Sequence, residues 1–208
     1  MLIDSPVMFN EQLRSLLQVM FQEGVNHAAQ GFSSMVGKKL AVSQPKVHLV
    51  PLAAVSNLLG GPESEAVGIY LRAHGEMAGQ IMLILSYPKA LELVDLILNE
   101  PPGTAHRLGA LERSALAELG NLTGSFFLNA VAAFAGLEAR PTPPAVMVDM
   151  VGAILDVVVP TYAAVGKHVL LLPVAFVGDE REVQADFWVV PDPAALETFA
   201  QRSRARER

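Results

Sequence analysis

Apolar residues recur every three or four positions in two long segments of the chain, near 9–35 and near 111–135. This spacing matches one face of an α-helix, so both segments are predicted to be helices that bury this face in a core. In the second segment the positions expected to face the core are Leu111, Leu116, Leu119, Leu122, Phe126, Phe127, Val131 and Phe134. One long helix therefore opens each half of the chain.

Runs rich in β-branched and aliphatic residues follow each long helix. They cover 42–50, 67–73 and 77–85 in the first half, and 146–151, 167–176 and 183–190 in the second. The last two runs of each half flank short turns, His74-Gly75-Glu76 and Gly178-Asp179, which predicts two antiparallel hairpins. Pro88 and Pro193 then open further helices, and a loop is expected between the first strand and the first hairpin. This alternation predicts an α+β fold in which two halves share an antiparallel-rich sheet covered by helices.

A shift of 99 residues superposes the two halves without a gap around their helices and first strands. It places Ser15 on Ser114, Gly37 on Gly136, Pro45 on Pro144 and Val47 on Val146. Because helix, turn, proline and strand recur in the same order, the chain 1–208 is predicted to be one domain made by duplication. The repeats are assigned to 9–100 and 104–200, joined by a linker with two prolines and a glycine. The arginine-rich tail at 201–208 is expected to fray in solvent.

Composition narrows the class of protein. The 208 residues are 51% hydrophobic, which is ample for a sizeable core, and the net charge of −6 argues against a general nucleic-acid binder. The absence of cysteine excludes disulfides, zinc–thiolate sites and thiol catalysis. No apolar run is long enough to cross a membrane, so we expect a cytoplasmic protein. The scattered histidines show no metal-ligand spacing, and no nucleotide or hydrolase motif is present, so neither a metal nor a cofactor of its own is expected.

Three polar residues share one stripe of the second long helix. Ser114, Glu118 and Asn121 lie at i, i+4 and i+7, and Pro144 follows after 22 further residues. A carboxylate can pair with a cation on a partner, and a carboxamide can hold a water molecule because it both donates and accepts hydrogen bonds. A solvated helix face is the simpler interpretation of Glu-x-x-Asn alone. The complete four-residue pattern arises by chance in roughly one chain of this length in several hundred, which favours a functional site.

This pattern resembles the signature of the CheC-type phosphatases of bacterial chemotaxis, a family that includes CheC, CheX and FliY. Segments 114–122, 143–150 and 35–51 resemble the corresponding family segments, so the resemblance covers most of the chain. It implies a pseudo-twofold fold with the stripe facing outward, as a protein substrate requires, and no enclosed pocket. It also implies hydrolysis of the aspartyl phosphate on a CheY-type response regulator, which would carry its own Mg²⁺. Asn121 would position the water, Glu118 would pair with the regulator's lysine, and Ser114 and Pro144 would support them.

The first half has lost this signature. Ser15 and Pro45 keep its two ends, whereas Val19 and Gln22 stand where the glutamate and asparagine should be. The carboxylate is missing, and the amide sits one methylene further from the backbone. Catalysis is therefore assigned to the second half, and the first is treated as a degenerate site.

The resemblance also allows a role without catalysis. The alternative is a binding module that docks a response regulator or a CheD-type receptor deamidase, and flagellar-switch relatives are a third possibility. Activity distinguishes the first two hypotheses, since binding alone is common to both. The duplication places within one chain an interface that a single-repeat relative would form as a homodimer, which favours a monomer.

Overall fold

The computed structural model describes residues 48–162, 168–178 and 181–206, the pair 41–42 and a set of positions between 15 and 33. The described positions of that set are all helical, as predicted for this segment. They are 15, 18, 19, 22–24, 26, 27, 30 and 33. The other positions of the first predicted helix lie outside the described residues, and so does Pro45.

Eight strands of the described chain form one antiparallel sheet. They are β1 (Ala41–Val42), β2 (His48–Pro51), β3 (Glu65–Gly75), β4 (Gly79–Ser86), β5 (Ala139–Pro141), β6 (Ala145–Met150), β7 (His168–Gly178) and β8 (Arg181–Pro191). The order is β1-β7-β8-β4-β3-β5, with β2 also pairing with β7 and β6 also pairing with β3. Both predicted hairpins, β3–β4 and β7–β8, are confirmed.

The two halves exchange strands across this sheet. The short strands β1 and β2 of the first half pair with β7 of the second, whereas β5 and β6 of the second half pair with β3 of the first. The hairpins meet at the centre, where β4 pairs with β8 and Met82 lies opposite Trp188. The order therefore reads alike from either end with the halves interchanged. The duplication within a single domain stays a prediction.

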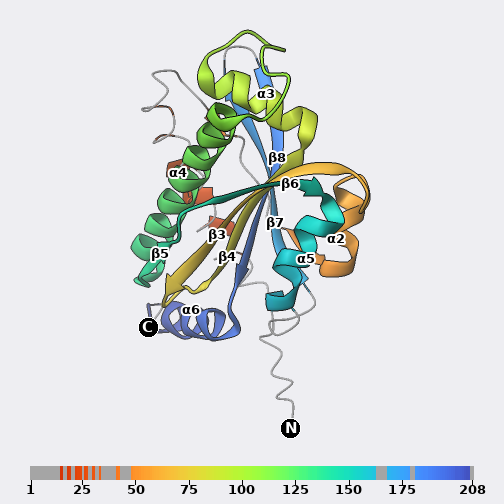
Figure 1. Ribbon diagram of the computed structural model, residues 1–208. Coiled ribbons are helices and arrows are strands. Elements are labelled where there is room, and N and C mark those ends of the chain that lie inside the picture. Colours follow the sequence, from red (N-terminus) through yellow and green to blue (C-terminus); the bar gives the residue numbers. More distant parts are fainter. Residues whose placement is uncertain are drawn as a thin grey trace.

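Helices cover both faces of the sheet (Figure 1). On one face lie α3 (Tyr87–Leu98), α4 (Ala110–Ala135) and α6 (Pro193–Arg206), and on the other lie α2 (Leu52–Leu58) and α5 (Val151–Tyr162). Alternate residues of each strand point to opposite faces, so Ile81 and Leu83 of β4 enter the first core, and Met82 and Ile84 the second. Every residue of β4 except Ser86 is buried, as expected of a central strand covered on both sides. The α+β prediction is confirmed.

Two features differ from the sequence-based expectations. The segment expected to be a loop after the first strand contains α2, which buries Val55 completely against the second face. The arginine-rich end is not a frayed tail up to Arg206, because α6 extends to that residue. The apolar run of α2 is short and carries too little periodicity to separate helix from loop.

The linker between the repeats is held by a buried carboxylate. Asp95 of α3 is 2% exposed, and its two oxygens accept hydrogen bonds from the backbone N–H groups of Gly103, Thr104 and Ala105 at 2.7, 3.1 and 2.8 Å. Asn99, with a φ of 62°, ends α3 in the left-handed conformation. The linker is thus fixed where it delivers the chain to α4.

Candidate functional site

The candidate site lies on α4, the longest helix of the described chain. Its sequence is rich in leucine and alanine, and it buries Leu116, Leu119 and Val131 completely against the sheet. It ends at Gly136, which has a φ of 66° and donates its N–H to the carbonyl of Ala132 at 2.8 Å. This rigid element carries all three helical residues of the signature.

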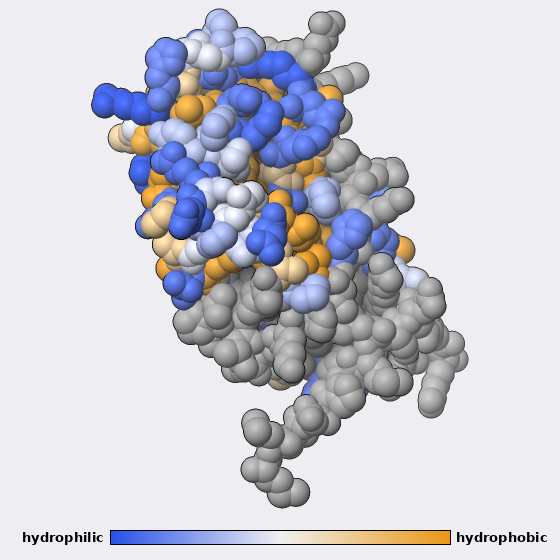
Figure 2. Space-filling view, turned by 90° about the vertical axis from the view of Figure 1, so that its right-hand side faces the viewer, coloured by the Kyte–Doolittle hydropathy of each residue, from blue (hydrophilic) through white to orange (hydrophobic). Residues whose placement is uncertain are grey.

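The polar stripe faces outward on α4, which lies on the left of Figure 1; Figure 2 shows the opposite side of the molecule, where Figure 1 draws α2 and α5. Ser114 and Glu118 are exposed, and Asn121 is half-buried on the same side of α4. Within the described part of the chain, none of the three side chains forms a hydrogen bond or an ion pair. A carboxylate and a carboxamide are therefore presented with their bonding capacity unused.

Gly120 brings this part of the helix close to the sheet. A Cβ atom built on Gly120 would lie 2.4 Å from Cγ2 of Ile69 in β3 and 3.5 Å from Cβ of Pro144. One turn later, a Cβ on Gly124 would lie 3.0 Å from Cδ2 of Leu71. The structure thus brings Pro144, which enters β6, beside the helical turn that carries Asn121. Sequence reasoning missed Gly120, although a glycine between the signature's glutamate and asparagine was a visible signal.

The degenerate half presents its stripe in a similar way. Ser15 is exposed, Val19 is 49% exposed and Gln22 is half-buried. The two long helices meet where a Cβ on Gly24 would lie 2.7 Å from the ring of Phe127. The exposure pattern of the signature positions is kept in the first half, but the carboxylate is not.

Leu111 does not face the core, contrary to the prediction. Its side chain is 64% exposed. Leu111 precedes Leu116 by five positions, which places it about 140° around the helix from that core residue. It instead shares the stripe of Ser114 and Glu118, three and seven positions further on.

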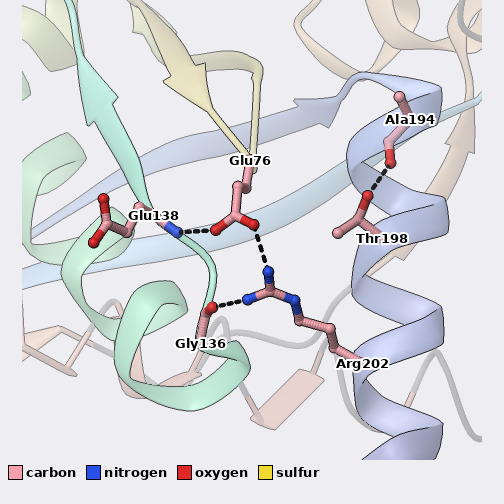
Figure 3. Close-up of polar contacts among 6 residues, drawn as sticks. All are labelled: Glu76, Gly136, Glu138, Ala194, Thr198 and Arg202. Atoms are coloured by element: carbon pink, nitrogen blue, oxygen red, sulfur yellow. Dashed lines mark hydrogen bonds and ion pairs between the residues drawn. The ribbon is translucent and has the colours of Figure 1, made fainter.

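The far end of α4 is fastened to two other elements (Figure 3). A guanidinium nitrogen of Arg202 in α6 lies 2.5 Å from Oε1 of Glu76, and another donates to the carbonyl oxygen of Gly136. The Oε2 atom of Glu76 accepts the backbone N–H of Glu138 at 3.1 Å, and the N–H of Glu76 donates to the carbonyl of Glu138 at 2.8 Å. A cation beside the last carbonyls of a helix also suits its dipole. These contacts join α4 to the β3–β4 turn of the other half.

A groove of about 440 Å³ lies away from the signature. Its lining includes Lys89 of α3, Pro173 of β7 and Asp186 of β8, and no signature residue. Burial raises the pKa of the Asp186 carboxyl above its usual value. The stripe on α4, an open helix face, remains the better candidate for acting on a protein.

Two searches of the described residues bear on other classes of function. No group of three or more histidine, aspartate or glutamate residues there is placed to hold a metal ion. None of the described helices combines the length and the apolar character needed to cross a membrane.

The chain is similar in sequence to known proteins. The model of the CheC-like family matches residues 111–148, the segment from the start of the stripe into β6. The CheY-P phosphatase CheC of Bacillus subtilis (strain 168) is 24% identical over 191 residues, which cover 90% of this chain and 91% of that protein. The chain is thus similar to the CheC-like family over this segment and to a CheC protein over most of its length.

Solved structures of other proteins have a similar fold. FliY of Thermotoga maritima superposes with a TM-score of 0.75 at 14% identity, covering 94% of this chain and 97% of FliY. A chain of the FliM–SpeE complex from H. pylori gives 0.69 at 11% identity, covering 93% of this chain and 97% of that chain. A chain of the CheX–CheY–BeF3–Mg²⁺ complex from Borrelia burgdorferi gives 0.50 at 16% identity, covering 83% and 97%. At these identities the similarity establishes the fold alone.

Proposed function

We propose that this protein hydrolyses the aspartyl phosphate of a CheY-type response regulator, using Glu118 and Asn121. The observation that carries the proposal is an exposed carboxylate and a half-buried carboxamide on one face of a rigid helix, both without partners among the described residues. The name of the B. subtilis relative, a CheY-P phosphatase, supports the reaction. The complex of CheX with CheY supports the kind of partner.

In this proposal Asn121 positions the attacking water. Its carboxamide oxygen accepts a hydrogen bond from the water and directs a lone pair of the water oxygen towards phosphorus. The new P–O bond forms as the bond from phosphorus to the aspartyl oxygen breaks, which releases inorganic phosphate and the regulator's free carboxylate. An acyl phosphate is already reactive, so placing the water in line supplies most of the catalysis.

Glu118 binds the regulator in this proposal. Its free carboxylate pairs with the regulator's active-site lysine, which orients α4 over the phosphoryl group and competes for the lysine's contact with it. The regulator supplies its own Mg²⁺. Ser114 supports the orientation of the helix, and Pro144 supports the turn that carries Asn121, because it packs beside Gly120.

The test is the rate of phosphate loss from a phosphorylated, Mg²⁺-loaded CheY-type regulator of the same source. The wild-type protein should accelerate this loss, and Glu118→Ala and Asn121→Ala should each abolish most of the acceleration while the far-UV circular dichroism stays unchanged. Removal of the Asn121 carboxamide is expected to cost on the order of a hundredfold, by analogy with loss of one positioned transition-state donor. Full activity in a folded Asn121→Ala variant would exclude the role given to this residue.

A docking protein without catalysis is the second candidate. Val19 in the first half shows that this fold can carry an exposed stripe with no carboxylate at its centre, and FliY and FliM share the fold. In that case the protein would bind a response regulator or a CheD-type deamidase. Tight binding to the regulator with no acceleration by the wild type would favour this candidate.

A further inference from the structure

Leu111 is an exposed apolar side chain in line with the candidate site. Among the described residues, no other large hydrophobic side chain is as exposed as Leu111, at 64%. It lies in the first turn of α4, three positions before Ser114 and seven before Glu118. On an α-helix these three positions project from the same side.

A partner that reaches both Glu118 and Asn121 must also cover Leu111. With a rise of 1.5 Å per residue, Leu111 lies about 10 Å along the axis from Glu118 and about 15 Å from Asn121. A specific interface covers about 800 Å² on each partner, a patch roughly 30 Å across. The partner's surface therefore extends over Leu111 whenever both signature residues are engaged.

The two ends of the stripe differ in chemistry. Beyond Asn121 the same side continues with Ser125, which is half-buried, and Asn129, which is exposed, so that end is polar. The N-terminal end carries the apolar Leu111. The shift of 99 residues places Gln12 at the corresponding position of the degenerate half, so the apolar end belongs to the intact repeat.

We propose that Leu111 is a docking contact for the phosphorylated response regulator, and that it packs against an apolar side chain about 10 Å from the regulator's active-site lysine. The proposal rests on the proposed function, because it takes the regulator as the partner of the stripe. Leu111 touches no reacting atom in this arrangement. Together with the polar opposite end, it fixes the direction in which the regulator lies along α4.

Steady-state kinetics of Leu111→Ser on the phosphorylated, Mg²⁺-loaded regulator test this role. Loss of the apolar contact should raise KM about tenfold and leave kcat unchanged. Leu111→Met, which restores an apolar side chain of similar size, should return KM to within about twofold of the wild type. Val157→Ser is the matched control, because Val157 is 59% exposed but lies on α5, across the sheet from α4.

A parallel binding measurement separates failure of this inference from failure of the proposed function. Affinity for the regulator activated with beryllofluoride and Mg²⁺ should fall about tenfold in Leu111→Ser, whether or not the wild type is a catalyst. Unchanged KM and affinity in Leu111→Ser, with activity lost in Asn121→Ala, would overturn the docking contact and leave the phosphatase standing. Weaker binding by Leu111→Ser with no turnover by the wild type would support the contact and refute the phosphatase. An equal loss in Val157→Ser would also overturn the specific contact.

Discussion

The two long helices present corresponding positions with similar exposure but different chemistry. Val19 in the first half is exposed and Gln22 half-buried, as are Glu118 and Asn121 in the second. The two stripes are therefore presented alike, and they differ in the two side chains at these positions. Comparing the halves within one molecule separates presentation from chemistry.

The halves also differ beneath the stripe. Gly120 and Gly124 let α4 approach β3, whereas the shift of 99 residues places Phe21 and Val25 at the corresponding positions of the first half. A side chain at Gly120 would collide with Ile69, so an approach this close needs glycine. The intact signature thus coincides with a helix set close to the sheet, and the first half has lost both the signature and its glycines.

The largest expected effect on turnover is that of replacing Asn121 by glutamine, the residue at the corresponding position of the first half. Asn121→Gln keeps the carboxamide but moves it outward by one methylene, about 1 Å or more. A misplacement of about 1 Å can cost a hundredfold in rate, so turnover of the phosphorylated regulator should fall by about that factor. Single-turnover kinetics would measure it. An Asn121→Gln variant as fast as the wild type would mean that the extra methylene in Gln22 does not explain the degenerate site.

The close approach of α4 to β3 at Gly120 can be tested by adding a side chain at this position. Gly120→Ala should destabilise the fold by about 2 kcal/mol, because its Cβ would lie 2.4 Å from the buried Cγ2 of Ile69 and overpacking exceeds the gain in helix propensity. Gly124→Ala is the graded comparison, since its nearest neighbour is the end of the Leu71 side chain at 3.0 Å, and its cost should be below about 1 kcal/mol. Urea unfolding would measure both. Equal free energies of unfolding for the two variants would contradict the claim that α4 approaches the sheet more closely at Gly120 than at Gly124.

A smaller effect on kcat/KM is expected when Glu118 is replaced by valine, the residue at the corresponding position of the first half. Glu118→Val should lower kcat/KM about tenfold through loss of one charge-assisted contact to the regulator. The difference from the wild type should shrink as ionic strength rises, because salt screens an exposed ion pair. Glu63→Val, which removes an exposed carboxylate outside α4, is the control and should behave like the wild type. A salt-independent loss would argue against pairing with a lysine.

The smallest effect is expected from the reverse exchange. Val19→Glu combined with Gln22→Asn restores the side chains of the first stripe, but leaves Phe21 and Val25 where α4 has glycine. On the wild-type background, the total phosphatase rate should therefore rise by less than about twofold, since even a complete second site could only double the wild-type rate. The assay should be run on the Asn121→Ala background, where any new activity is visible. A rate close to that of the wild type would show that the first half lacks only its two side chains.

Local patterns predicted much of this molecule. Both hairpins, the strand 146–151 up to residue 150, and the helices opened by Pro88 and Pro193 follow from side-chain periodicity and turn residues, and the structure confirms them; of the strand predicted over 42–50, residues 43–47 lie outside the described residues. The family signature drew attention to the stripe on α4, which the structure places on an exposed face. Spacing along one helix sufficed for this, because residues i, i+4 and i+7 meet in any α-helix.

Long-range features could not be predicted in the same way. The pairing of β6 with β3 joins residues as distant in sequence as Glu65 and Met150, and no local pattern specifies which hairpin receives a short strand. The helix α2 was predicted to be a loop because its 7 residues span fewer than two turns. Leu111 was assigned to the core by its residue type, although the helical period placed it on the open side.

The exchange of strands between the halves sets the order of events during synthesis. Val67 of β3 pairs with Val148, so the outer edge of β3 lacks its partner until the ribosome has released most of the chain. An unpaired hairpin edge is a template for aggregation, and pairing over such separations is slow. The sheet of the first repeat therefore cannot be completed until β5 and β6 of the second repeat are present.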